Sequence, residues 1–214
     1  MKFLLPLIVI ITISCSERSK TEEISEEELT QIALEEGDRI STMAQKALGS
    51  QLKKAISEGG PVHAVRFCNT VAYPILDSLT TSMEVTIKRA SLRTRNPKDA
   101  PNKVERKILA IYNNQIANQQ TPKPVVEMLD GGRILYAKPI MLNNPLCLNC
   151  HGEVGTQIST DTHQLIEELY PEDNAIGHKL GDMRGIWSIT FREGDLVENL
   201  SEIKSAIDDI NKNN

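Results

Sequence analysis

The sequence predicts an α+β fold, in which a small antiparallel sheet is flanked by long N-terminal and C-terminal helices. Apolar residues recur at helical spacing over residues 29–56, whereas the stretch 85–87 alternates apolar and polar side chains as a half-buried strand does. From Leu196 onwards the apolar residues return to a helical spacing of four and three. The chain of 214 residues is long enough to bury a hydrophobic core, so we expect one domain with appendages.

The first helix begins with a clear start signal. Ser25 and Glu28 form the pattern of a capping box, in which each side chain bonds the backbone of the other residue. The two glycines at 59–60 end this helix, and the proline that follows them suits the first position of a second one. We expect the second helix to run to about Tyr73, where Pro74 ends or bends it, because proline lacks the N–H that a helix interior needs.

The rest of the chain alternates between strand and helix patterns. A basic loop from Ser91 to Pro101 separates the first strand from a third helix that begins at Asn102. Apolar stretches over 125–129 and 134–140 flank Asp130-Gly131-Gly132, a turn sequence that predicts a hairpin. The later elements are a loop up to Gly185, a strand over 186–191 and a last helix capped by Asp195.

The N-terminus has the pattern of an export signal. Its apolar run over residues 3–13 is too short to cross a bilayer and fits the apolar region of a secretory signal. The run ends in Thr12-Ile13-Ser14-Cys15, which resembles a bacterial lipoprotein signal with Cys15 as the acylated residue; the alternative is an ordinary signal in which Cys15 is incidental. We therefore expect a signal peptide over 1–14, a tether over 15–24, the main domain over 25–195 and a C-terminal helix over 196–214.

The composition argues against one class of partner. The net charge is −5 and aromatic residues make up 4% of the chain. Nucleic-acid binding needs a basic face for the phosphates, or aromatic platforms on which bases stack. We therefore expect no nucleic-acid partner.

The most specific motif is Cys147-Leu148-Asn149-Cys150-His151. Two thiols at this spacing can reach the two vinyl groups of one haem, and the adjacent histidine then lies beneath the iron. The motif predicts one covalently attached haem c. A thioredoxin-like disulfide is an alternative, although Pro145 and Gly152 do not suit a motif that opens a helix. A zinc site is another, with Cys68 and a histidine as further ligands.

The ligand opposite His151 has several candidates. Cys68 lies on the apolar face of the second predicted helix, although a lone buried thiol is also a common small hydrophobe. Met183 lies downstream of the motif, as the ligand of an ordinary small cytochrome c does, or it is a loop methionine. The other candidates are the histidines His63, His163 and His178.

Several further segments lie on both sides of the motif: Phe67-Cys68-Asn69, Ser91-Leu92-Arg93-Thr94-Arg95-Asn96-Pro97, Ala100-Pro101-Asn102, Tyr170-Pro171-Glu172-Asp173, Gly181-Asp182 and Arg184-Gly185. Together with the motif they resemble a family of exported single-haem c-type proteins with a PAS-like fold, which also occur as sensory domains of bacterial signalling proteins. The resemblance implies a PAS-like domain with His151 and Cys68 as the axial pair. His178 stands where this family would have a tyrosine, and we assign it no role.

Four polar residues near these segments could bind the cofactor or support the structure. Arg93 and Arg95 suit haem propionates, because a guanidinium presents a planar fork to a carboxylate. The alternative for them is a solvated loop or carboxylate pairs within the protein. Asp182 and Arg184 flank a glycine-bounded turn, and we expect them to be structural.

Three functions fit these features. The first is a haem-based sensor of redox state or of a small ligand, in which Cys68 yields its place because a protonated thiol binds ferrous iron weakly. The second is a low-potential electron carrier, since an anionic sulfur stabilises ferric iron. The third, a haem enzyme of the peroxidase or nitrogen-oxide reductase type, is disfavoured. With Cys15 acylated, the protein would be anchored in the cell envelope, facing the periplasm, beside a redox or signalling partner.

Overall fold

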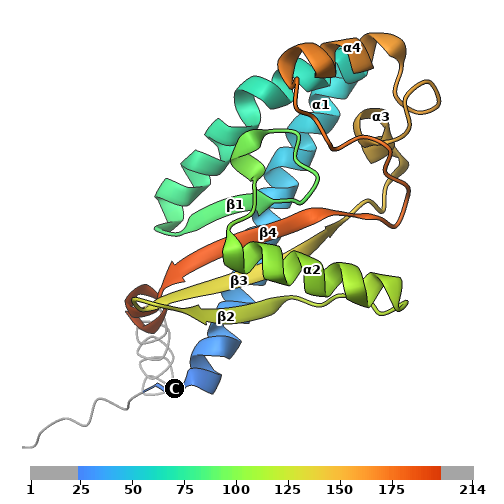
Figure 1. Cartoon of the computed structure of the whole chain (residues 1–214). Helices are drawn as coiled ribbons and strands as arrows, with labels where there is room; N and C mark the ends of the chain where they lie inside the picture. Colours follow the sequence, from blue (N-terminus) through green and yellow to red (C-terminus); the bar gives the residue numbers. More distant parts are fainter. Residues whose placement is uncertain (1–23, 199–214) are drawn as a thin grey trace, which may run out of the picture.

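The computed structural model describes residues 24–198, and within them four strands form one antiparallel sheet (Figure 1). The strand order is β1-β4-β3-β2. The strands are β1 (Thr86–Ala90), β2 (Val125–Leu129), β3 (Arg133–Met141) and β4 (Met183–Arg192). This arrangement confirms the predicted PAS-like α+β fold. The signal peptide, the tether, Cys15 and most of the C-terminal helix lie outside the described residues.

The long helix α1 (Glu26–Met83) has two arms. Its start is as predicted, since the Glu28 backbone N–H donates to Ser25 Oγ over 3.2 Å and the Ser25 N–H donates to Glu28 over 3.0 Å. The kink is also at the predicted place, because Gly59 and Gly60 have non-helical backbone angles. Gly60 has a φ of 70°, a left-handed conformation that favours glycine.

The prediction that the second arm ends at Pro74 is wrong. This arm continues to Met83 and is closed by Glu84 in a left-handed conformation. Ala72 and Leu76 lie on either side of the proline and are both buried. Burial of this continuous apolar face offsets the hydrogen bond that a proline removes from a helix.

The two faces of the sheet carry different layers. Both arms of α1 cover one face, where Ala44 and Leu76 belong to the same buried cluster as Trp187 of β4. The helix α2 (Lys103–Ala117) crosses the other face, as Figure 1 shows, and begins at the predicted cap Asn102. Its buried side chains pack against β3 and β4: Ile108, Leu109 and Tyr112.

The segment between β3 and β4 holds more helix than predicted. After the short turn η2 (Pro145–Cys147), the motif residues form α3 (Leu148–His151). The loop expected beyond them contains α4 (Thr160–Leu169), capped by the side chain of Ser159. The prediction of a loop is therefore wrong for α4, which packs beside α1 near its kink (Figure 1).

The described part of the chain ends in a short helical stretch. Residues 193–198 are helical, so the last helix begins two residues before the predicted cap Asp195. Within residues 24–198, no helix is both long and apolar enough to cross a bilayer.

Candidate functional site

The motif and the second arm of α1 meet at one cavity. Cys68 of α1, Cys147 of η2, and Cys150 and His151 of α3 all line it, in a space of about 240 Å³. We call this space the thiol cavity. Most of its remaining wall is apolar and includes Leu48, Leu52, Ile56, Val65, Phe67, Ile140 and Trp187. Residues from the α1 arms, β1, β4 and the motif segment are thus brought together around one set of sulfur and nitrogen donors.

His151 is held in one tautomer. Its Nδ1 lies 2.8 Å from the carbonyl oxygen of Ala175, and because a carbonyl can only accept, Nδ1 carries the proton. Burial, followed by repulsion from Arg184 and Arg95, holds the pKa of His151 well below its usual range. The imidazole is therefore neutral, and its Nε2 has a free lone pair. This is the state in which histidine binds a metal, with a hydrogen bond on the other nitrogen fixing the ring.

The thiols of the cavity are free and partly buried. Cys68, Cys147 and Cys150 form no disulfide within residues 24–198. Burial raises the pKa of Cys68, an effect opposed by the positive charges of Arg89 and Arg95. Burial also raises the pKa of Cys150 to about 11. Cys68 and Cys150 are therefore protonated at neutral pH unless a metal or a covalent bond removes the proton.

Two arginines of the basic loop hold the segment that orients His151. Arg95 bonds both carboxylate oxygens of buried Asp173, at 3.2 and 3.0 Å, and donates to the Cys150 carbonyl over 2.6 Å. The same carboxylate accepts from the Ala175 N–H over 2.9 Å. Since the Ala175 carbonyl bonds His151, Arg95 and Asp173 fix the ring through this one residue.

Arg93 acts on the neighbouring part of that segment. Its guanidinium donates to the carbonyl oxygens of Asn174 and Ile176. Arg95 lines the thiol cavity, whereas Arg93 is not part of its wall. Arg95 therefore has the carboxylate partner that was its alternative, whereas Arg93 bonds backbone carbonyls; the propionate role of both stays a prediction.

Two other arginines of the wall are not among the cofactor-binding residues that the sequence predicts. Arg89 of β1 and Arg184 of β4 line the thiol cavity, and the Nε of each is buried without a hydrogen-bond partner among the described residues. Arg184 was expected to be structural, and it does bond Ser91 Oγ over 2.8 Å. A signal for Arg89 was present in the sequence, because it lies two residues from Ile87 and hence on the buried face of the strand.

The other candidates for the ligand opposite His151 lie elsewhere. Met183 packs against the cluster under α2. His63 and His163 are near glutamates at 3.9 and 3.7 Å. His178 is buried beside His151, with the ring centroids 6.2 Å apart and nearly perpendicular. None of the four lines the thiol cavity, which leaves Cys68 as the candidate that does.

The alternative of a zinc site is not supported by the donor geometry. Within residues 24–198, no group of three or more His, Cys, Asp or Glu side chains is arranged to hold a metal ion. The donors of the thiol cavity instead match what a covalently bound tetrapyrrole requires, namely two thiols, a neutral imidazole and an apolar wall.

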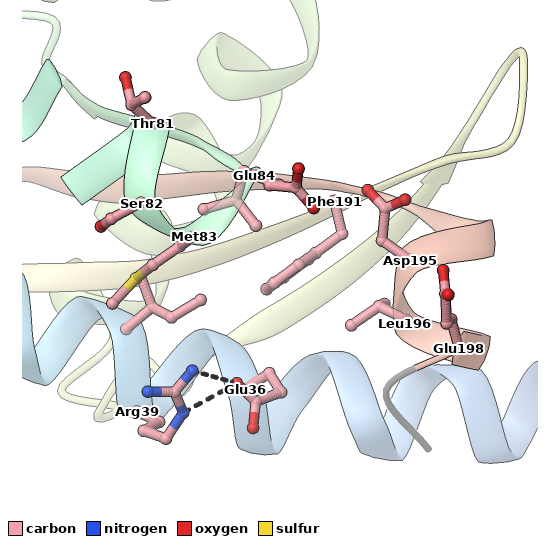
Figure 2. Close-up of a pocket in the computed structure, with 12 residues that line it drawn as sticks. Glu36, Arg39, Thr81, Ser82, Met83, Glu84, Phe191, Asp195, Leu196 and Glu198 are labelled. Atoms are coloured by element: carbon pink, nitrogen blue, oxygen red, sulfur yellow. Dashed lines mark hydrogen bonds and ion pairs between the residues drawn. The ribbon is translucent and has the colours of Figure 1, made fainter. Parts of the chain in front are cut away.

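A second hollow lies between the first arm of α1 and the end of β4 (Figure 2). It has a volume of about 580 Å³, and we call it the acidic cleft because its charged lining is mainly acidic: Glu36, Glu84, Asp195 and Glu198, with Arg39. Figure 2 shows Arg39 bonded to Glu36, an ion pair of 2.7 Å. Among the described residues, no thiol or imidazole lines the cleft.

The fold and the thiol cavity define a small PAS-like α+β protein in which sulfur and nitrogen donors line one largely apolar cavity. The chain belongs to the Tll0287-like family, whose model matches residues 17–192. A solved relative, the cyanobacterial heme-protein Tll0287, has the same fold with a TM-score of 0.53 and 22% sequence identity; the match covers 74% of this chain and 96% of that chain. No curated protein matches the chain.

Proposed function

We propose that the protein carries one haem c, attached through Cys147 and Cys150, with His151 and Cys68 as the axial ligands. The observation that carries this proposal is the thiol cavity itself, in which three free thiols and one neutral imidazole line an apolar space. A solved protein of the same fold is described as a haem protein, which supports the cofactor.

Haem supplies a one-electron couple and a site for small ligands when it is bound. The chain supplies one ligand that is held by a hydrogen bond and one that is not. His151 is fixed by Ala175, whereas Cys68 lies on a helix arm with no hydrogen bond to its sulfur among the described residues. A thiolate favours the ferric state, so the potential should be below that of Met/His cytochromes.

We propose that the protein acts as a sensor of redox state or of a small ligand rather than as an enzyme. Cys68 is the ligand suited to leave, because burial favours the protonated thiol and a protonated thiol binds ferrous iron weakly. The test is to add CO or NO to the reduced protein. A changed Soret spectrum supports ligand sensing, and an unchanged spectrum contradicts it.

Electron transfer is the second candidate, and one observation favours it. Cys147 and Cys150 are only half-buried, so the attached edge of the cofactor would lie close to the surface. Fast electron self-exchange together with an unchanged spectrum under CO would favour this role over sensing.

We further propose that acylated Cys15 anchors the protein in the cell envelope, facing the periplasm, beside a redox or signalling partner. The export pattern of residues 1–14 supports this location. Incorporation of a labelled fatty acid that is lost in Cys15→Ser is the expected result, and equal labelling of both proteins would contradict it.

A further inference from the structure

We propose that Arg184 and Arg89 bind the two carboxylate side chains of the haem. This inference rests on the proposed function, and it moves the anion-binding role from the arginines that the sequence favoured to two others. The basis is a pair of arginines that line the thiol cavity, each of which has a buried Nε without a hydrogen-bond partner among the described residues.

Arg184 is the stronger anchor of the two. One of its terminal nitrogens donates to Ser91 Oγ over 2.8 Å and to the Arg93 carbonyl over 2.9 Å. Its Nε is buried without a partner, and no carboxylate of the described residues lies within ion-pair distance of it. Burial, with repulsion from Arg95, lowers the pKa of its guanidinium to about 10. A buried cation in this situation is stabilised by an anion from outside the chain.

Arg89 lies on the sheet face that packs against α1, directly opposite Trp187 of β4. Its nearest carboxylate is Asp99 at 4.0 Å, the limit of an ion pair. That carboxylate already accepts a 2.6 Å hydrogen bond from the Tyr73 hydroxyl. The Nε of Arg89 is buried and unpartnered. The centroid of the Tyr73 ring also lies 5.9 Å from the Arg89 guanidinium carbon, but neither this contact nor Asp99 engages the buried Nε.

The charges around the cavity point to the same ligand class. Its wall contains the cations Arg89, Arg95 and Arg184 but only one carboxylate, that of Asp99. Arg95 is matched by Asp173 outside the wall, and Asp99 lies within ion-pair distance of Arg89 only, so Arg184 has no paired carboxylate among the described residues. A ligand with two carboxylates restores the balance, and the planar fork of arginine suits this group.

The test is resonance Raman spectroscopy of the haem-loaded full chain, read at the propionate bending bands. Arg184→Gln and Arg89→Gln should each shift a propionate band, because each removes a charge-assisted hydrogen bond. Arg93→Gln is the matched control, since Arg93 belongs to the neighbouring loop but not to the cavity wall. Unshifted bands in both test variants, or an equal shift in the control, would overturn the inference.

A second measurement does not depend on the covalent bond. In the full chain with Cys147→Ser and Cys150→Ser, haemin should bind on the order of a hundredfold more tightly than haemin dimethyl ester, in which both carboxylates are blocked, because each lost charged hydrogen bond costs roughly tenfold. Adding Arg184→Gln or Arg89→Gln should reduce this preference, and adding both should abolish it. A preference that persists would contradict the inference, whereas a native protein without attached haem would contradict the proposed function instead.

Discussion

The acidic cleft and the thiol cavity differ in whether their charged groups have partners among the described residues. In the larger acidic cleft, Glu36 and Arg39 satisfy each other at 2.7 Å close to solvent. In the smaller thiol cavity, Arg89 and Arg184 keep buried nitrogens without partners, beside free thiols and a neutral imidazole. The comparison teaches that unmet bonding capacity identifies the site better than volume does.

The largest effect should come from the ion pair that supports His151. Asp173→Ala leaves Arg95 buried without its carboxylate, which should lower the free energy of unfolding by about 3–5 kcal/mol. Denaturant titration measures this change. Glu172→Ala, at the exposed neighbour, is the control and should be close to neutral. Equal losses in the two variants would mean that the Arg95–Asp173 pair does not support the site.

Replacing the axial sulfur should have the next largest effect. Cys68→Ala removes an anionic ligand, so the Soret band should shift and the midpoint potential should rise by on the order of 0.1 V, roughly 2.3 kcal/mol. Potentiometry with absorption detection measures both. Met183→Leu, in the cluster under α2, should leave both unchanged. If Met183→Leu and not Cys68→Ala altered the spectrum, the ligand assignment would be wrong.

His178 should make the stability of the fold sensitive to acid. Burial, with repulsion from Arg93, lowers its pKa to about 4. The unfolded chain takes up this proton near pH 6.5, so stability should fall by on the order of 2 kcal/mol as the pH drops from about 6.5 to about 4. His178→Gln should lose this part of the slope in unfolding measured across that range. An identical slope in both proteins would refute the assignment.

The smallest effect should come from the acidic cleft. Arg39→Ala breaks the ion pair with Glu36. The Arg39 side chain is 57% exposed and that of Glu36 is 32% exposed. Exposed pairs contribute about 0–1 kcal/mol, so the unfolding free energy should change by no more than that, and the spectrum should be unaffected. A loss as large as that of Asp173→Ala would erase the contrast between the two hollows.

Local signals explain which parts of the fold could be predicted from the sequence. The capping residues Ser25 and Asn102 act within one helical turn, and the hairpin turn at 130–132 acts between adjacent strands, so all three were found. The continuation of α1 past Pro74 was not, because it depends on burial of Leu76 against a distant sheet. The helix α4 was missed although Ser159 supplies a cap at its start.

The site residues also fall into two groups, those that the sequence predicts and those that only the structure identifies. Cys147, Cys150 and His151 follow from their spacing, and Cys68 follows from a resemblance that extends over most of the chain. The partners of the arginines depend on contacts between segments about 80 residues apart, such as Arg95 with Asp173. Spacing along the chain contains no information on which arginine keeps a free donor. That distinction required the packed cavity.

The most direct test of the central claim is the intact mass of the denatured protein, expressed with haem-attachment machinery. The account predicts the polypeptide with one haem still bound, and loss of that added mass in Cys147→Ser with Cys150→Ser. A wild-type polypeptide that releases its haem on denaturation, or never carried one, would contradict it.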